Sequence, residues 1–297
     1  MDSPDKPGND DGGIYARASG SRHKTFVAIL VLCLLLSAGA QAAQTAAPVR
    51  EQVTVRLTAA VDHAGAAATI QAGLEIALDP GWHTYWRNPG ESGAAPRFDW
   101  SRSVNVKDIV FRWPLPQRFA TQDLSTFGYE RAVLFPLSLS VEKTGEPVTL
   151  ALDLNIVICE EVCIPKNFTL SLDLPAGMAK QTPEASAISA AFDELPAQAD
   201  GPGLKIESAV AGPAALVVRA YSAQRYENAD LFVETPPDSV IVTAKPEITP
   251  DEKDPRYATL RIPAPQGTDN LAAALMGKKV TLTLVAPGGA LEKEISF

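Results

Sequence analysis

The stretch VTLALDLNIVICEEVCIPKNFTLSLDL, residues 148–174, alternates apolar and polar side chains on both sides of two cysteines. Before the cysteines, Leu152 and Leu154 fall on one side of an extended chain and Asp153 falls on the other. The segment FTLSLDL at 168–174 repeats the pattern. A period of two is typical of half-buried antiparallel strands with one face in water. The stretch therefore predicts two strands that meet at the cysteine pair.

The same alternation recurs along much of the 297-residue chain. The 24 prolines and 20 glycines fall mostly between the alternating segments, where turns are expected. Many short strands joined by turns predict an all-β fold built as a β-sandwich. Besides the opening stretch, the predicted strands are VTVRLTAAV, TIQAGLEIALD, LKIESAV, AALVVRAYS, DLFVET, VIVTAK, YATLRIPA, KKVTLTLVA and LEKEISF.

One segment interrupts the alternation. In TPEASAISAAFDELP, residues 182–196, a Thr-Pro-Glu start signal precedes Ile188, Phe192 and Leu195 at helical spacing. Pro196 ends the pattern, so we expect a short helix between two β-domains. The predicted domains are a β-sandwich at 48–176, a linker helix at 182–200 and a second, smaller β-sandwich at 203–297.

The N-terminus has the composition of a secretory signal peptide. Arg17, Arg22 and Lys24 precede the apolar run FVAILVLCLLL at 26–36, and small residues follow up to Ala42. A charged region, a short apolar region and an Ala-x-Ala exit predict cleavage near Ala42 and export of the mature chain. An uncleaved membrane anchor is the alternative, although eleven apolar residues are few for crossing a bilayer.

Removal of residues 1–42 changes the cysteine count. Cys33 leaves with the leader, and the exported chain keeps only Cys159 and Cys163. An even count in an exported protein predicts a disulfide bond formed in an oxidising compartment. The net charge is −9 and no basic run is present, so nucleic acid is excluded as a partner. No other apolar run reaches 18 residues, and we expect the mature protein to be soluble.

The cysteine pair has three interpretations. A disulfide between Cys159 and Cys163 closes a very short loop and would constrain the unfolded chain by only about 2 kcal/mol. Thiol–disulfide exchange therefore ranks above a purely structural disulfide, because exposed short-loop disulfides are the kind that react with partner thiols. The third interpretation is a Cu(I) site completed by His63 or His83. No resident metal or cofactor is expected.

Two glutamates lie between the cysteines. Glu160 and Glu161 would disfavour a neighbouring thiolate and raise the pKa of its thiol. The disulfide would then be comparatively reducing, which suits a protein that hands electrons on.

Two aromatic segments are further candidates for the site. DPGWHTYWRNPGESG, residues 79–93, holds Trp82, His83 and Tyr85, which form either a rigid platform beside the disulfide or ordinary core packing. The triplet Phe127-Gly128-Tyr129 is either a plain loop between strands or a lid over the disulfide.

Taken in order, DPGWHTY at 79–85, Phe127-Gly128-Tyr129-Glu130 and the segment from Cys159 to Pro165 resemble the periplasmic N-terminal domain of the DsbD family, also found in ScsB proteins. The resemblance covers about residues 50–175. It implies an immunoglobulin-like sandwich in the periplasm, whose cysteines accept electrons from a membrane-embedded partner and pass them to thioredoxin-fold proteins. Cytochrome c biogenesis and copper tolerance are the processes with which this resemblance connects the chain.

The resemblance also assigns roles by position. Cys159 and Cys163 would be the redox pair, with Cys163 as the attacking thiol, although the spacing is wider in better-known members. Phe127 would match the aromatic residue of a cap loop that covers the disulfide, with Gly128 and Tyr129 in inverted order after it.

Two other parts of the sequence depart from the pattern of the family. The acidic pair that precedes the cap aromatic in the family is replaced by Ser125-Thr126, and Glu160 and Glu161 would be its substitutes. The aromatic wall, where the family has tyrosines, would consist of Trp82, His83 and Tyr85.

The expected function is a thiol–disulfide relay. A membrane-embedded thiol reductase on a separate chain would reduce the pair, which would then reduce periplasmic thioredoxin-fold proteins. The transmembrane conduit and thioredoxin-like domain of full-length family members are not part of this sequence. The alternative is a non-enzymatic binding module, with a structural disulfide or a Cu(I) site. We expect a monomer.

Overall fold

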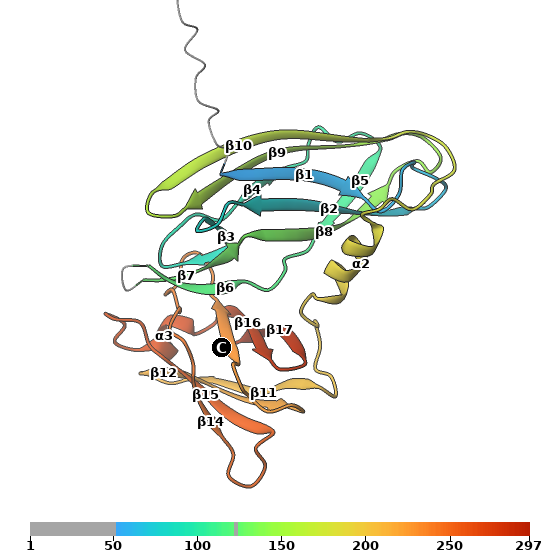
Figure 1. Ribbon diagram of the computed structural model, residues 1–297. Coiled ribbons are helices and arrows are strands. Elements are labelled where there is room, and N and C mark those ends of the chain that lie inside the picture. Colours follow the sequence, from blue (N-terminus) through green and yellow to red (C-terminus); the bar gives the residue numbers. More distant parts are fainter. Residues whose placement is uncertain (1–51, 122–123) are drawn as a thin grey trace, which may run out of the picture. The chain divides into compact units, whose positions relative to one another are not determined.

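The structure, a computed structural model, describes residues 52–121 and 124–297 (Figure 1). The predicted signal peptide at 1–42 lies outside the described residues. The first domain contains two antiparallel sheets. One has the order β1 (Val53–Ala59), β2 (Thr69–Leu78), β8 (Ala132–Val141) and β5 (Val106–Phe111). The other has the order β10 (Cys163–Leu174), β9 (Val148–Cys159), β3 (His83–Gly90), β7 (Leu124–Glu130) and β6 (Gln117–Thr121), with β4 (Arg97–Asp99) paired to β9.

The alternation of apolar residues explains why the two sheets pack together. Along β9, Leu150, Leu152 and Leu154 are fully buried, whereas Asn155 is exposed. Phe135 in β8 is also fully buried and belongs to the same apolar core. Each fully buried side chain of this size contributes about 1.5–3 kcal/mol relative to exposure. The core between the sheets therefore holds the strands that carry the cysteines in place.

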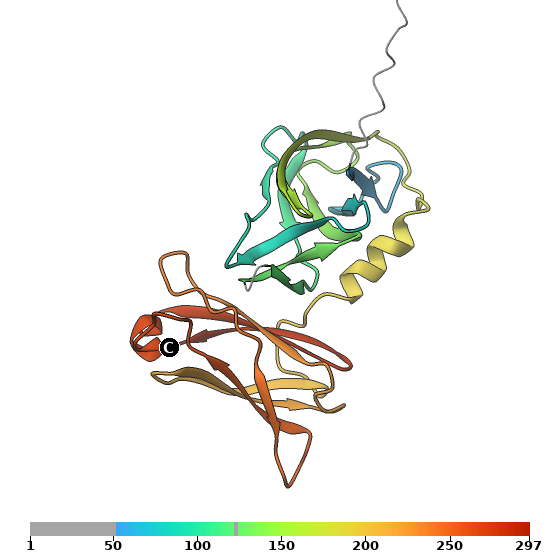
Figure 2. The same cartoon turned by 60° about the vertical axis from the view of Figure 1, so that its left-hand side comes forward.

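The predicted helix forms as α2 (Ala185–Asp193), which Figure 2 shows beside the first domain. It contacts β2 and β8, and its Ile188 is fully buried. Gly73 of β2 makes room for this helix, because a Cβ atom there would lie 3.3 Å from Ile188 Cγ1 and 2.7 Å from Leu134 Cδ1. The helix thus packs on the sheet that lies across the sandwich from the cysteines.

The second domain is also built from two antiparallel sheets, with a helix, α3 (Leu271–Leu275). Leu216, Leu260 and Leu282 come from different strands and are fully buried in its core. One sheet has the order β11 (Leu204–Ala211), β12 (Ala215–Ser222), β15 (Tyr257–Pro263) and β14 (Glu247–Pro250), and the other β13 (Asp230–Glu234), β16 (Lys279–Ala286) and β17 (Gly289–Ser296). The predicted all-β class with sandwich domains and a short helix between them is confirmed.

One predicted strand of the second domain is wrong. The segment VIVTAK, residues 240–245, belongs to no sheet, although Val242 is buried. Prolines at 236, 237 and 246 flank it, and proline cannot donate a hydrogen bond to a sheet ladder. The alternation of apolar residues there reflects burial against the core rather than strand pairing.

Candidate functional site

The two cysteines close the β9–β10 hairpin. Cys159 is the last residue of β9, Cys163 is the first of β10, and the two are directly opposed. They form a disulfide bond with an S–S distance of 2.06 Å and a Cα–Cα distance of 4.1 Å. Cys159 is 2% exposed, Cys163 is exposed, and Val162 between them is 69% exposed. Only one sulfur-bearing residue of the pair is therefore open to an approaching thiol.

The pairing of β3 with β9 determines which side chains surround the disulfide. His83 lies directly opposite Cys159, so their side chains are on the same face of the sheet. Tyr85, two residues along β3, shares that face. Thr84 pairs with Ile158, which is fully buried in the sandwich core. The face of the sheet that carries His83, Tyr85 and Cys159 is therefore the one that points away from the core. The disulfide thus lies on the outer face of the six-stranded sheet.

Tyr85 contacts both sulfur atoms. Its hydroxyl lies 2.9 Å from Cys159 Sγ and 3.7 Å from Cys163 Sγ. Because a disulfide carries no S–H group, the hydroxyl is the donor. The residue is 3% exposed, and burial raises the pKa of the Tyr85 hydroxyl, which keeps its proton available. Gly93 covers the ring at a φ of 116°, where a Cβ atom would lie 2.2 Å from it.

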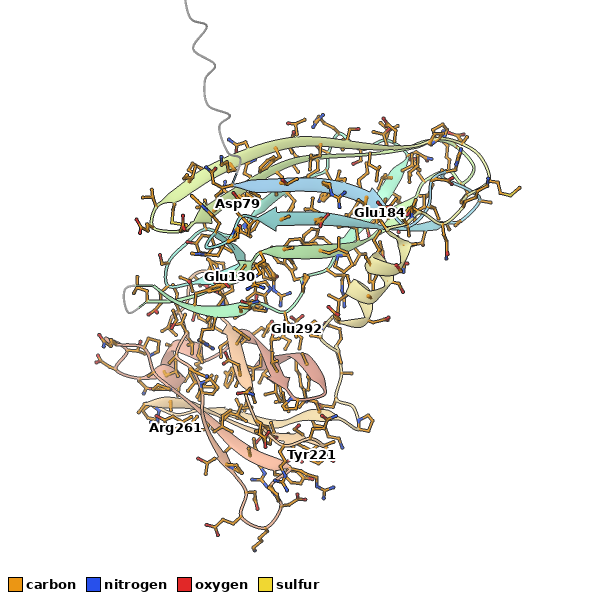
Figure 3. All side chains as sticks on the ribbon, in the orientation of Figure 1. Asp79, Glu130, Glu184, Tyr221, Arg261 and Glu292 are labelled. Atoms are coloured by element: carbon orange, nitrogen blue, oxygen red, sulfur yellow. A yellow bond between two sulfur atoms is a disulfide. The ribbon has the colours of Figure 1, made fainter. Side chains whose placement is uncertain are left out.

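His83 and Phe119 complete the outer face of the site. The His83 ring stacks on Phe119 with centroids 5.2 Å apart and meets the edge of Tyr85 at 5.6 Å. Burial lowers the pKa of His83, and the charge of Glu130 (labelled in Figure 3), which pairs with His83 in the sheet, partly opposes this shift. Aromatic contacts of this geometry are each worth about 0.5–1.5 kcal/mol beyond burial. The imidazole is therefore held between two rings in its neutral form.

The predicted cap role of Phe127 is wrong. Gly128 lies opposite Tyr85 on the outer face, so its neighbours Phe127 and Tyr129 point to the inner face. Phe127 is fully buried and packs edge-on against Phe232 at 5.1 Å. Gly128 brings β7 close to β3, since a Cβ atom there would lie 1.9 Å from the carbonyl oxygen of Thr84. Strand periodicity thus places the Phe127 ring away from the disulfide.

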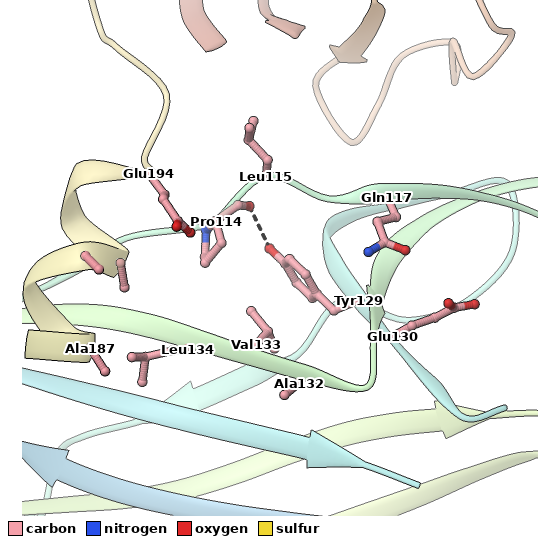
Figure 4. A pocket seen from close by; sticks show the side chains of 12 residues that line it. Pro114, Leu115, Gln117, Tyr129, Glu130, Ala132, Val133, Leu134, Ala187 and Glu194 are labelled. Carbon is pink, nitrogen blue, oxygen red and sulfur yellow. Dashed lines mark hydrogen bonds between the residues drawn. The ribbon is translucent and has the colours of Figure 1, made fainter. Parts of the chain in front are cut away.

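Tyr129 has a separate environment on the inner face. Its hydroxyl donates a hydrogen bond to the carbonyl oxygen of Pro114 at 2.9 Å, as Figure 4 shows. Burial raises the pKa of this hydroxyl well above its ordinary value. The ring lines a pocket of about 390 Å³, together with Glu130, Val133 and residues of α2. Tyr129 is thus a core residue with one satisfied hydroxyl, not part of a lid.

The remaining predicted residues lie around the hairpin. Trp82 is half-buried and packs against the core of the first domain, so it is not part of the group that contacts sulfur. Glu160 and Glu161 are exposed in the turn. The side chain of Glu160 lies over Gly81, where a Cβ atom would be 2.6 Å from its Oε1 atom. The hairpin tip is therefore an acidic surface next to the accessible cysteine.

The structure adds Phe119, which the sequence analysis did not single out. It faces the site because β6 pairs with β7 in a register that puts Phe119 opposite Thr126. The sequence feature that points to Phe119 is a short alternating segment before the strand of Phe127, in which Phe119 lies two positions after Gln117. This feature places Phe119 in the site only when the register between β6 and β7 is known.

The two histidines considered for Cu(I) lie apart. His83 is beside the disulfide, whereas His63 lies beside Gly177, beyond the end of β10 at Leu174. Cys163 begins the same strand, so the two ends are about 35 Å apart at 3.3 Å per residue. Among residues 52–121 and 124–297, no cluster of three or more His, Cys, Asp or Glu side chains is arranged to hold a metal ion. Within the same ranges, no helix is long and apolar enough to span a membrane.

Two family models match the chain. The family described as "Thiol:disulfide interchange protein DsbD, N-terminal" matches residues 49–175. Over this range the chain is similar to the DsbD N-terminal family. Residues 194–296 match a family described only as a domain of unknown function, DUF8393. No curated protein is significantly similar to the chain.

A solved structure supports the fold across both domains. The crystal structure of the N-terminal periplasmic domain of ScsB from Proteus mirabilis is 24% identical, with a TM-score of 0.66. The alignment covers 84% of this chain and 95% of that one. A marsupial T cell receptor also aligns over 84% of this chain and 99% of its own, but its TM-score of 0.21 and 10% identity are too low to bear on the fold. The region similar to the DsbD N-terminal family contains the Cys159–Cys163 disulfide, and the predicted immunoglobulin-like sandwich is confirmed.

Proposed function

We propose that this protein is a periplasmic thiol–disulfide relay that works through Cys159 and Cys163. The observation that supports the proposal best is the asymmetry of the pair: Cys163 is exposed, while Cys159 is buried and accepts a hydrogen bond from Tyr85. An accessible sulfur receives the attack, and a buried sulfur with a donor beside it leaves as a stabilised thiolate.

Reduction of the pair proceeds in two exchange steps. A thiolate of the incoming dithiol attacks Cys163 Sγ, the Cys159–Cys163 bond breaks, and Cys159 leaves as a thiolate that accepts the Tyr85 hydrogen bond. The second thiol of the donor loses its proton and attacks the mixed disulfide, which releases Cys163. Two electrons and two protons pass from the donor dithiol to the cysteine pair, and the donor becomes a disulfide.

Delivery reverses these steps on a client. The Cys163 thiolate attacks a client disulfide, and Cys159 then attacks the mixed disulfide to release the reduced client. We infer that the donor is a membrane-embedded thiol reductase on a separate chain and that the clients are periplasmic thioredoxin-fold proteins. The likeness to a domain of a thiol–disulfide interchange protein and to the periplasmic domain of ScsB supports this assignment. The exposed hairpin tip fits brief docking, because exchange requires direct sulfur–sulfur contact.

Trapping tests the proposal. A Cys159→Ala variant keeps the exposed Cys163 thiol but lacks the residue that resolves the mixed disulfide, so it should accumulate covalent complexes with thioredoxin-fold proteins in the exporting cell. A Cys163→Ala variant, with only the buried cysteine, is the matched control and should trap few. If the wild-type disulfide resists dithiothreitol in the native protein and Cys159→Ala traps no more than the control, the disulfide is structural and the proposal is wrong.

A further inference from the structure

The last strand of the six-stranded sheet, β6, carries side chains to both faces. Phe119 lies opposite Thr126 on the outer face, where it stacks on His83. Its neighbour Arg118 lies opposite Phe127 on the inner face. A strand at the edge of a sheet has backbone partners on one side only, so its position depends strongly on side-chain contacts.

Arg118 is held by the second domain, which belongs to the same compact unit of residues 51–297. Its guanidinium makes a two-pronged ion pair with Asp230 of β13, with both nitrogen–oxygen distances 2.9 Å. It also donates to the carbonyl oxygen of Thr243. The side chains of Arg118 and Asp230 are only 13% and 17% exposed. A bidentate arginine–carboxylate pair fixes orientation as well as distance.

Aromatic packing adds to this contact. The Arg118 guanidinium lies 4.8 Å from the centre of the Phe127 ring and 5.1 Å from that of Phe232. Phe232, in β13, is 3% exposed and packs with the core of the first domain. Residues of the second domain therefore hold β6 from its inner face, one residue away from Phe119 on the outer face.

A continuous series of contacts leads from that point to the disulfide. Phe119 stacks on His83, His83 packs against the edge of Tyr85, and the Tyr85 hydroxyl donates to Cys159. We propose that Arg118 is a positioning residue through which the second domain holds Phe119 against His83 and so sets the reactivity of the Cys159–Cys163 disulfide. The inference rests on the proposed exchange at that disulfide, and it gives the second domain a role in the chemistry of the first.

Loosening β6 would have two consequences at the site. The His83 ring would lose the face that Phe119 covers and become more hydrated. The Tyr85 ring would lose part of its support, so its hydroxyl would stabilise the Cys159 thiolate less steadily, while the sulfur atoms would become more accessible. The first consequence changes a titration and the second changes an exchange rate, so both can be measured without a client protein.

The experiment compares Arg118→Met with the wild-type protein. Methionine keeps an unbranched apolar side chain against Phe127 but removes the ion pair with Asp230. We expect the pKa of His83, followed by NMR, to rise towards its ordinary value, and the rate of disulfide reduction by dithiothreitol to change by about 3-fold or more. Asp230→Asn, which keeps the shape of the side chain, should change the pKa of His83 and the reduction rate in the same direction but by less.

Arg102→Met is the matched control. Arg102 makes an equally bidentate pair with Asp153 of β9, at 2.9 and 2.8 Å, but that pair is exposed and lies away from β6. Its loss should leave the His83 titration and the reduction rate unchanged. If Arg118→Met and Asp230→Asn fold but titrate and react as the control does, the inference is wrong while the proposed function stands. If the wild-type disulfide resists dithiothreitol and Cys159→Ala traps no more complexes than Cys163→Ala, the proposed function is wrong and this inference fails with it.

Discussion

At the scale of single residues, the proposed exchange depends on the difference in exposure between two cysteines that are four positions apart. The two cysteines are directly opposed in the hairpin, but their exposure differs. Cys159 is buried next to Tyr85, whereas Cys163 faces solvent. A protonated hydroxyl beside the buried sulfur acts on the thiolate more strongly than on the disulfide, because hydrogen bonds to charged groups are the stronger ones. In the proposed exchange, Tyr85 is thus the side chain placed to stabilise the Cys159 thiolate.

Replacing Tyr85 by phenylalanine should make the disulfide harder to reduce. The ring keeps its packing, but the Cys159 thiolate loses a hydrogen bond worth about 1.5–3 kcal/mol, so the pKa of its thiol should rise and the reduction potential should become more negative. The potential is measured by equilibration with dithiothreitol, and the thiol pKa by thiolate absorbance. Tyr129→Phe is the control, since it removes a buried hydroxyl that binds Pro114 on the inner face. Equal potentials in the two variants would exclude this role for Tyr85.

His83 should make the stability of the protein depend on pH. Its pKa is lowered in the folded protein by burial, with Glu130 opposing, so the unfolded chain takes up the proton first as the pH falls. The free energy of unfolding should therefore be highest above about pH 6.5 and decrease as the pH falls below that value. It should level off once the pH is below the pKa of His83 in the folded protein. Urea midpoints of the wild-type protein and of His83→Phe, measured between pH 8 and pH 5, test this. Parallel curves for the two proteins would contradict the prediction.

At the scale of secondary-structure elements, the local features of the site could be predicted and the non-local ones could not. The β9–β10 hairpin is encoded in one alternating stretch, so the sequence indicated that Cys159 and Cys163 lie at its tip. The face on which Phe127 lies depends on how β7 pairs with β3, more than forty residues earlier in the chain. A shift of one residue in that register moves every side chain to the other face. For the same reason Phe119 could not be recognised as part of the site.

Gly128 is the residue that allows this pairing of β3 and β7. A Gly128→Ala substitution would bring a Cβ atom to 1.9 Å from the Thr84 carbonyl oxygen, so the strands must separate. We expect a loss of about 3 kcal/mol in the free energy of unfolding, the upper end for a single overpacked position, with a weaker Tyr85–Cys159 contact. Urea unfolding checks this. Gly203→Ala, where a Cβ atom meets no atom within 4 Å, should be close to neutral. Similar midpoints for both variants would be the contrary result.

The disulfide itself should contribute little to the stability of the β9–β10 hairpin. The two strands pair over 12 residues each, and the bond closes a loop whose entropy is worth only about 2 kcal/mol. The oxidised protein and the Cys159→Ala/Cys163→Ala double variant should therefore differ by no more than about 2 kcal/mol in unfolding free energy, as measured in urea. A difference twice as large would favour a structural disulfide.

At the scale of the whole molecule, charged and aromatic groups of the two β-domains contact one another within the compact unit of residues 51–297. Arg87 of β3 makes a bidentate pair with Glu234 of β13, at 2.8 and 2.6 Å, and a further pair with Glu292 of β17. Burial lowers the pKa of Arg87, but these two carboxylates outweigh it and raise that pKa overall. Partly buried pairs of this kind are costly to break singly, since one charge then remains without a partner.

Phe232 is the apolar part of the same contact, and its removal should uncouple the domains. The ring lies 5.8 Å from Trp86 and 5.1 Å from Phe127, both in the first domain, although Phe232 itself comes from β13. Phe232→Ala should therefore cost about 3–5 kcal/mol and separate one calorimetric transition into two, with the first domain melting at a lower temperature. Leu260→Ala, in the core of the second domain, is the control and should lower the stability of that domain directly. If both variants melt in the same pattern, the Phe232 contact does not couple the domains, because this ring comes from β13 of the second domain but packs in the core of the first.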